Sequence, residues 1–117
     1  MIFAISGYLF AADYTARVYD REDTTYVPLY NAQVVWKFEG EPPLIQYTDI
    51  NGKCSTTHDP SDSCMLSVSA SAPGYTPVNP ASGSYTVYCY EQFQFTFIMD
   101  DTDILSGFDL DVGFGFI

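Results

Sequence analysis

Apolar side chains recur at every second position along much of this chain, which is the period of a half-buried β-strand. In residues 32–39 the alternate positions are Ala32, Val34, Trp36 and Phe38. Residues 66–70 and 93–97 repeat the pattern, and no long stretch has the 3.6-residue period of an amphipathic helix. We therefore expect strands over residues 2–12, 32–39, 44–48, 53–57, 65–70, 85–90 and 92–99.

The best-defined turn lies at Asn51-Gly52. Asn followed by Gly favours a two-residue type I′ hairpin turn, because both central positions need a positive φ. Asp49 can accept hydrogen bonds from the backbone that follows it. We therefore expect residues 44–48 and 53–57 to form a hairpin.

Two polar segments interrupt the strand pattern. Residues 13–26 contain charged residues of both signs, and we expect a long loop or an exposed hairpin through residues 16–19. Residues 75–83 contain Pro, Asn and Ser, which predict a loop. The core should then come from the alternating strands, with these residues buried: Trp36, Phe38, Leu66, Val68, Phe95 and Phe97.

The composition favours an all-β protein of one domain. Aromatic residues make up 17% of the 117 residues. Aromatic and β-branched residues favour strands, and the helix formers Ala, Leu, Lys and Glu are few. Short strands with turn residues between them are typical of a β-sandwich.

The net charge is −11, from 15 acidic and 4 basic residues. So few basic side chains cannot neutralise a nucleic-acid backbone, which excludes nucleic acid as a partner, and an anionic membrane would repel the chain. The acidity either keeps the protein soluble or serves a divalent cation or a basic partner. Asp100, Asp101 and Asp103 offer oxygen ligands of the kind that Ca²⁺ takes, although they do not match an EF-hand loop. An exposed acidic turn is the alternative.

Three cysteines and one histidine remain as candidates for chemistry. Three cysteines allow three pairings. Cys54 and Cys64 flank a polar loop, so we expect a disulfide between them, with Cys89 left as a buried thiol. His58 has no second histidine with which to build a zinc site. His58, Cys54 and Cys64 could in principle bind a metal, but they have no C-x-x-C arrangement, and a histidine in a polar loop is the alternative. No G-x-S-x-G motif is present, so no catalytic residue is assigned.

Three tyrosines near the end of the strand pattern are candidate contact residues: Tyr85, Tyr88 and Tyr90. Rigid aromatic side chains are effective at interfaces, and their faces can receive a sugar or a protein partner. In an alternating strand, however, at least one face usually belongs to the core.

Four motifs occur in an order that resembles the carboxypeptidase regulatory-like domains. They are Ser6-Gly7-Tyr8-Leu9, the Pro-Leu-Tyr-Asn-Ala-Gln-Val of residues 28–34, the Thr-Asp-Ile-Asn-Gly-Lys of residues 48–53, and a strand over residues 66–75 that ends in Gly-Tyr. The resemblance covers residues 5–99. This chain departs from the family at Asn31, where Gly is usual, at Cys54, where an aromatic is preferred, and in its longer segment 13–26.

The resemblance implies a seven-stranded Greek-key β-sandwich, transthyretin-like and Ig-like, over residues 1–99. Residues 100–117 then form an acidic turn and an extra C-terminal strand. The family is chiefly non-enzymatic and supplies spacers, interaction modules and surface-assembly subunits. The hydroxyisourate hydrolase of similar architecture needs several histidines and a Tyr-Arg-Gly-Ser ending, which this sequence lacks.

We therefore expect no enzyme and no cofactor, but a structural subunit of the virion-decoration or extracellular-filament type. Its partners would be copies of itself or a larger protein assembly. A carbohydrate-binding or adhesion module is the alternative. The two hypotheses differ in the partner that the protein contacts, and the fold alone does not decide between them.

The tail of the chain carries the assembly hypothesis. Its apolar positions alternate without interruption: Phe108, Leu110, Val112, Phe114 and Phe116. An apolar strand of this kind has to be covered. It either folds back as an edge strand of its own sheet or pairs with a sheet edge of a neighbouring subunit by β-augmentation.

The start of the sequence has no recognisable secretion signal. Its apolar run, residues 2–10, follows no basic segment and is too short to span a bilayer, so we expect no membrane insertion. Either the chain is not secreted by this route, or the sequence is a mature form or a fragment. The resemblance implies a location on an extracellular surface or a virion.

Overall fold

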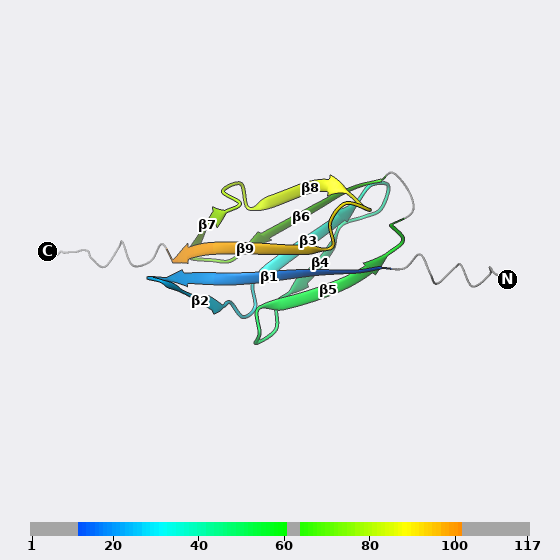
Figure 1. Ribbon diagram of the computed structural model, residues 1–117. Helices are drawn as coiled ribbons and strands as arrows, with labels where there is room; N and C mark the ends of the chain where they lie inside the picture. Colours follow the sequence, from blue (N-terminus) through cyan, green and yellow to red (C-terminus); the bar gives the residue numbers. More distant parts are fainter. Residues whose placement is uncertain (1–11, 61–63, 102–117) are drawn as a thin grey trace, which may run out of the picture.

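The fold is a β-sandwich in which strands from both halves of the chain contribute to each sheet (Figure 1). The computed structural model describes residues 12–60 and 64–101. These ranges hold nine strands: β1 (Ala12–Glu22), β2 (Thr25–Pro28), β3 (Gln33–Phe38), β4 (Leu44–Tyr47), β5 (Lys53–His58), β6 (Met65–Ser71), β7 (Tyr75–Asn79), β8 (Ser84–Tyr88) and β9 (Gln94–Asp101). The expected all-β sandwich is confirmed, with nine strands in the described part where the resemblance implies seven.

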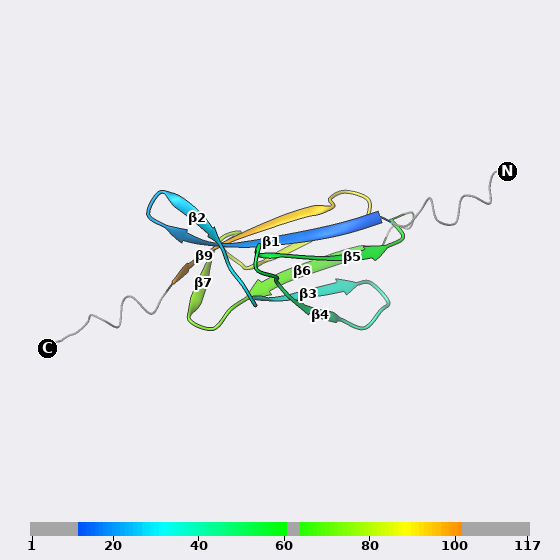
Figure 2. The ribbon, with the colours of Figure 1, turned by 90° about the horizontal axis from the view of Figure 1, so that it is seen from below.

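The five-stranded sheet is built around β1. On one side β1 pairs in parallel with β9, from Thr15 opposite Gln94 to Asp20 opposite Met99. On its other side, β5 pairs with the first half of β1 and β2 with the second half, and β7 lies beyond β9. Because β1 and β9 run in the same direction, the described chain enters at one end of the sandwich and leaves at the other (Figure 1 and Figure 2).

The four-stranded sheet has the order β4-β3-β6-β8, with antiparallel pairing throughout. Val35 of β3 lies between Ile45 of β4 and Ser69 of β6. The strands β4 and β8 are therefore the two edges of this sheet. No helix among the described residues has the length and apolar character needed to cross a membrane.

Side chains from both sheets meet in one core. The rings of Trp36 and Phe95 pack edge to face across the two layers, with centroids 6.0 Å apart. All six residues that the alternation predicts to be buried are at most 5% exposed: Trp36, Phe38, Leu66, Val68, Phe95 and Phe97. β1 adds Tyr14, whose hydroxyl donates a hydrogen bond to the carbonyl oxygen of Cys89 at 2.6 Å.

The segment 13–26 is not the loop that its polar composition predicts. It forms most of β1, and residues 16–19 lie in the middle of that strand instead of in a turn. Its charged side chains Arg17 and Arg21 lie on the outer face, where each contacts a polar residue of β9. The charged side chains on its outer face and the long-range pairing with β9 hid this strand from a local pattern. The hairpin turn lies at Asp23-Thr24.

The Asn51-Gly52 turn differs from the expectation in type and in what it joins. Since β4 and β5 belong to different sheets, the turn is a crossover between the layers, not a hairpin. Within it only Gly52 has a positive φ, +74°. The Gly52 N–H donates to Asp49 O at 2.8 Å, and the Asp49 N–H donates to Lys53 O at 3.0 Å. This is a three-residue turn with Gly in the left-handed position, not type I′.

Two residues hold the crossover against the strands beside it. Thr48 is 2% exposed, and its Oγ1 accepts from the Ala32 N–H at 2.8 Å and donates to Leu29 O at 2.6 Å. At Gly52, a Cβ would lie 2.6 Å from the carbonyl oxygen of Val18. The Gly is therefore needed for close approach to β1 as well as for its φ.

Residues 75–83, expected to be a loop, begin with the short strand β7. β7 lies at the sheet edge, and its pairing with β9 shifts between Pro77 and Asn79. Proline is tolerated there because an edge strand has an N–H side that needs no partner. The last expected strand of the sandwich, residues 92–99, corresponds to β9, which extends beyond residue 99 to Asp101.

Two expected strands lie outside the described residues. They are the first strand, residues 2–12, apart from Ala12, and the C-terminal strand with Phe108, Leu110, Val112, Phe114 and Phe116. Both remain predictions. The ends from which these segments continue, at β1 and β9, lie at opposite ends of the sandwich (Figure 1).

Candidate functional site

The cysteines pair differently from the expectation. The disulfide joins Cys64 to Cys89, with Cα atoms 5.7 Å apart, and Cys54 is free. The expected bond between Cys54 and Cys64 is therefore wrong. The reason lies in strand pairing: Met65 of β6 faces Tyr88 of β8, so the flanking cysteines face each other, whereas Cys54 lies on β5 in the other sheet.

The free thiol of Cys54 is half-buried on β5. Burial, with the carboxylate of Asp49 nearby, raises the pKa of this thiol to about 11. A thiol with that pKa stays protonated near neutral pH, and only the thiolate is a good nucleophile or metal ligand. Cys54 is therefore a packing residue and not a reactive one.

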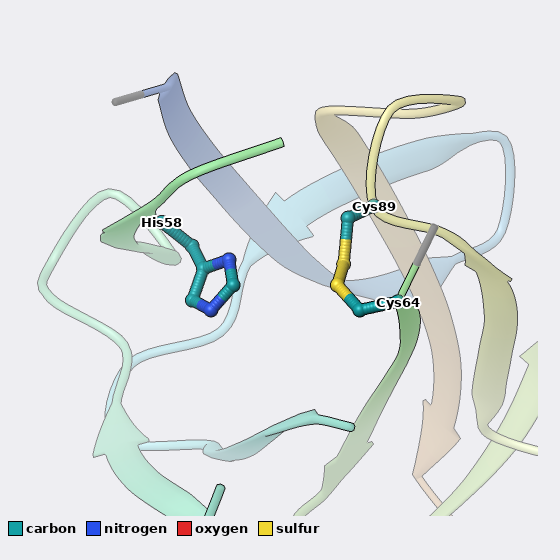
Figure 3. Close-up of side chains that lie close together, drawn as sticks. All are labelled: His58, Cys64 and Cys89. Atoms are coloured by element: carbon teal, nitrogen blue, oxygen red, sulfur yellow. A yellow bond between two sulfur atoms is a disulfide. The ribbon is translucent and has the colours of Figure 1, made fainter. Parts of the chain in front are cut away.

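His58 lies beside the disulfide, at the end of β5 (Figure 3). Its ring stacks on Phe38, with centroids 3.9 Å apart. Nε2 lies 2.7 Å from Glu41 Oε2, and Nδ1 lies 2.9 Å from Asp59 O. A ring nitrogen and the two disulfide sulfur atoms all lie within 4.8 Å of one another. The set considered from the sequence was His58 with Cys54 and Cys64, but the β6–β8 pairing brings Cys89 to this place and Cys54 is not part of the group.

Of the three predicted calcium ligands, the structure describes Asp100 and Asp101. Asp100 forms a two-point ion pair with Arg21, in which Nε–Oδ1 is 3.0 Å and Nη2–Oδ2 is 2.7 Å. Asp101 is the last residue of β9, and Asp103 lies outside the described residues. Both oxygens of Asp100 are therefore engaged by the neighbouring strand.

A carboxyl group that the sequence did not single out is buried nearby. Asp20 of β1 is 6% exposed, and its Oδ1 has no hydrogen-bond partner among the described residues. Burial raises the pKa of this carboxyl above its usual range, and the neighbouring Glu22, Asp101 and Asp100 raise it further. Asp20 continues the inward row of β1 that includes Val18, so the period of two would have predicted its burial once the strand was recognised.

The three predicted contact tyrosines divide into two environments. Tyr85 packs edge to face on Phe95, and its hydroxyl donates to Thr96 O at 2.8 Å. Tyr88 and Tyr90 are 41% and 54% exposed, and their rings stack with centroids 5.5 Å apart. The exposed pair, and not Tyr85, offers ring surface to a sugar or protein partner.

Exposed apolar side chains occur on β4 and in the turn that follows it. We call this set the β4 flank: Leu44, Ile45, Tyr47 and Ile50, each at least 42% exposed. The two sheets are joined here, since Gln46 Nε2 of β4 donates to Ser55 O of β5 at 3.0 Å. The β4 flank therefore lies where the two layers are joined.

A hollow of about 490 Å³ adjoins this flank at Tyr47. Its lining is mostly small and polar: Asn31, Gln33, Tyr47, Ser71, Ala72 and Pro73. The phenol of Tyr47 is the single titratable side chain in that lining. That lining contains no carboxylate, histidine, lysine or cysteine side chain.

No family model, no curated protein and no solved structure matches this chain. Three features of the described residues are left from which function can be inferred. They are the β4 flank, the stacked tyrosine pair, and the group formed by His58 with Cys64 and Cys89.

Proposed function

We propose that this protein is a non-enzymatic structural subunit that assembles with copies of itself through contacts between sheet edges. The order of its motifs supports a transthyretin-like sandwich of the carboxypeptidase regulatory-like type. That family includes surface-assembly subunits. The single observation that carries the proposal is the exposed apolar edge at β4.

Edge strands of soluble proteins usually carry a feature that prevents pairing with another chain, such as Lys, Pro or a bulge. Three other edges of this sandwich have one: β5 begins with Lys53, β2 ends with Pro28, and β7 contains Pro77 at its register shift. β8, the second edge of the four-stranded sheet, has no such feature, but fewer of its side chains are exposed than on β4. β4 contains no charged residue and no Pro. Ile45 and Tyr47 of β4 are 52% and 56% exposed. β4 is therefore suited to receive a further strand.

The occupant that fits this edge is the C-terminal segment of another copy, residues 107–117. Its alternating pattern supplies one apolar face, which can cover Ile45 and Tyr47 while its backbone pairs with β4. Residues 102–106 reach about 17 Å when extended, so the segment can leave its own sandwich. The C-terminal segment would leave the sandwich at the end opposite to the one at which β1 starts.

Such a contact is head-to-tail, because different surfaces of the two copies meet. Head-to-tail contacts build rings when the rotation closes and filaments when it does not. This geometry agrees with a filament or particle-decoration subunit. It needs no ligand, metal or catalytic residue.

Deletion of residues 107–117 tests the proposal. We expect the full chain to form oligomers or regular filaments, and the shortened chain to be a monomer with unchanged circular dichroism and melting temperature. Multi-angle light scattering measures the mass, and electron microscopy shows order. A full chain that is monomeric at all concentrations contradicts the proposal, as does a shortened chain that unfolds or stays assembled.

A matched pair of substitutions tests the choice of edge. Tyr47→Lys places a charge on β4, and Tyr88→Lys places the same charge on β8, the other edge of the same sheet. Both side chains are exposed, so neither change should affect folding. Assembly should be lost in Tyr47→Lys and kept in Tyr88→Lys, and the reverse result would exclude β4 as the acceptor.

A further inference from the structure

The group formed by His58, Cys64 and Cys89 contains three metal-ligating side chains from three segments. Cys64 directly precedes β6, Cys89 directly follows β8, and His58 ends β5 of the other sheet (Figure 3). Their donor atoms lie within 4.8 Å of one another. In the oxidised protein the two sulfur atoms are bonded to each other, so they are not available as ligands.

The backbone around this group is held without the disulfide. The Cys89 N–H donates to Cys64 O at 2.9 Å, and the buried Tyr14 hydroxyl donates to Cys89 O at 2.6 Å. The Glu39 side chain accepts from the Met65 N–H at 2.9 Å. Because these bonds do not involve sulfur, breaking the S–S bond leaves both cysteines facing each other.

The histidine ring is also held independently of the sulfur atoms. It stacks on Phe38, and Glu41 Oε2 lies 2.7 Å from Nε2. A carboxylate that binds one imidazole nitrogen orients the ring and makes the other nitrogen a better ligand, as in many zinc sites. Nδ1 would exchange its contact with the Asp59 carbonyl for the metal.

We propose that the reduced protein binds a zinc-class divalent cation through the sulfur atoms of Cys64 and Cys89 and through Nδ1 of His58. Zn²⁺ binds thiolate sulfur at about 2.3 Å and imidazole nitrogen at about 2.0–2.1 Å, so tetrahedral donors lie roughly 3.5 Å apart. Donors within 4.8 Å reach that spacing by rotation of side chains. The fourth position is left to water.

Reduction of the disulfide and the metal binding that follows conserve electrons and protons. A thiol or phosphine reductant supplies two electrons, the S–S bond breaks, and two protons complete the two thiols. Metal binding then releases those two protons, because the thiolates are the ligands. The oxidised protein has a cross-link at this place, and the reduced protein has a metal bridge that ties β5 to the β6–β8 pair. This inference does not depend on the proposed assembly.

Cobalt is the probe, because Co²⁺ bound to thiolate gives charge-transfer bands in the near ultraviolet and d–d bands in the visible. The full chain is reduced with a phosphine without oxygen and titrated with Co²⁺, then with Zn²⁺. We expect one Co²⁺ per chain, with both sets of bands, and displacement by Zn²⁺. The oxidised protein should give neither set.

Three variants assign the ligands. Cys54→Ser removes the thiol outside the group and should leave the spectrum unchanged. His58→Gln should weaken binding and shift the d–d bands, because a nitrogen ligand is lost. Glu41→Gln should keep the band positions and weaken binding about 10–100-fold, the usual effect of a residue that supports a ligand.

Several results would overturn the inference. They are the absence of thiolate–cobalt bands in the reduced, folded protein, and an unchanged spectrum in His58→Gln. If reduction unfolds the chain, refolding on addition of Zn²⁺ is measured by circular dichroism instead. Zinc should restore the strand signal of the wild-type chain but not of His58→Gln, and a failure to restore it also overturns the inference.

Discussion

The Thr48 hydroxyl is the most informative group to remove, because it makes two hydrogen bonds at the crossover between the sheets. Thr48→Val keeps the shape of the side chain and deletes the oxygen. The Ala32 N–H, in a fully buried residue, then loses its acceptor, and Leu29 O loses a donor. We expect the protein to remain folded but to be markedly less stable.

The size of the effect follows from these two groups. A buried polar group left without a partner costs about 1–3 kcal/mol. Leu29 is only partly buried, so water can replace part of its lost bond. The expected loss is therefore about 2–4 kcal/mol, smaller than two full penalties. In a domain of this size, that loss lowers the melting temperature by roughly 8–16 °C.

Urea unfolding followed by the fluorescence of Trp36 measures the loss. Trp36 is the single tryptophan of the chain and is fully buried. Thr48→Ser is the control, because it keeps the hydroxyl and should cost about 1 kcal/mol for the lost methyl group. A Thr48→Val protein within about 0.5 kcal/mol of the wild type, or more stable than Thr48→Ser, would refute the reasoning.

Two further predictions test the same fold. Gly52→Ala should cost about 2 kcal/mol or more, because the left-handed φ and the approach to Val18 O both resist a Cβ. Gly40→Ala, at φ +85° but with no atom near its Cβ, should cost clearly less, and equal losses of unfolding free energy would exclude the steric contribution. Asp20→Asn should stabilise the protein near neutral pH. Burial raises the pKa of Asp20 in the folded state, so its favourable contribution is present below the unfolded pKa of about 4 and is lost as pH rises through the folded pKa. Urea unfolding should show the gain at neutral pH and little at about pH 4, and equal differences at both would contradict this.

Local pattern alone determined which residues of several strands face the core. Alternation in β3, β6 and β9 correctly predicted the burial of Trp36, Val68 and Phe95, because the two faces of a strand follow from its period of two. The turn sequence likewise predicted that the Asp49 carboxylate binds the backbone that follows it, and this carboxylate accepts from the N–H groups of Asn51 and Lys53. These are properties of a few consecutive residues.

Strand partners were decided only by the tertiary structure. β1 is central because it pairs with β9 from the far end of the chain, and a local pattern of polar and small residues does not contain that pairing. The Asn51-Gly52 turn has the same local preference in a hairpin and in a crossover, so packing of Gly52 against Val18 decided between them.

The composition of the candidate site was also decided only by the tertiary structure. Each cysteine has a plausible local environment, and any of three pairs can form a bond on paper. The antiparallel register of β6 and β8 brings Cys64 opposite Cys89, and the second sheet brings His58 beside them. Which side chains meet is thus a property of the register and layer packing, which depend on contacts far apart in the chain.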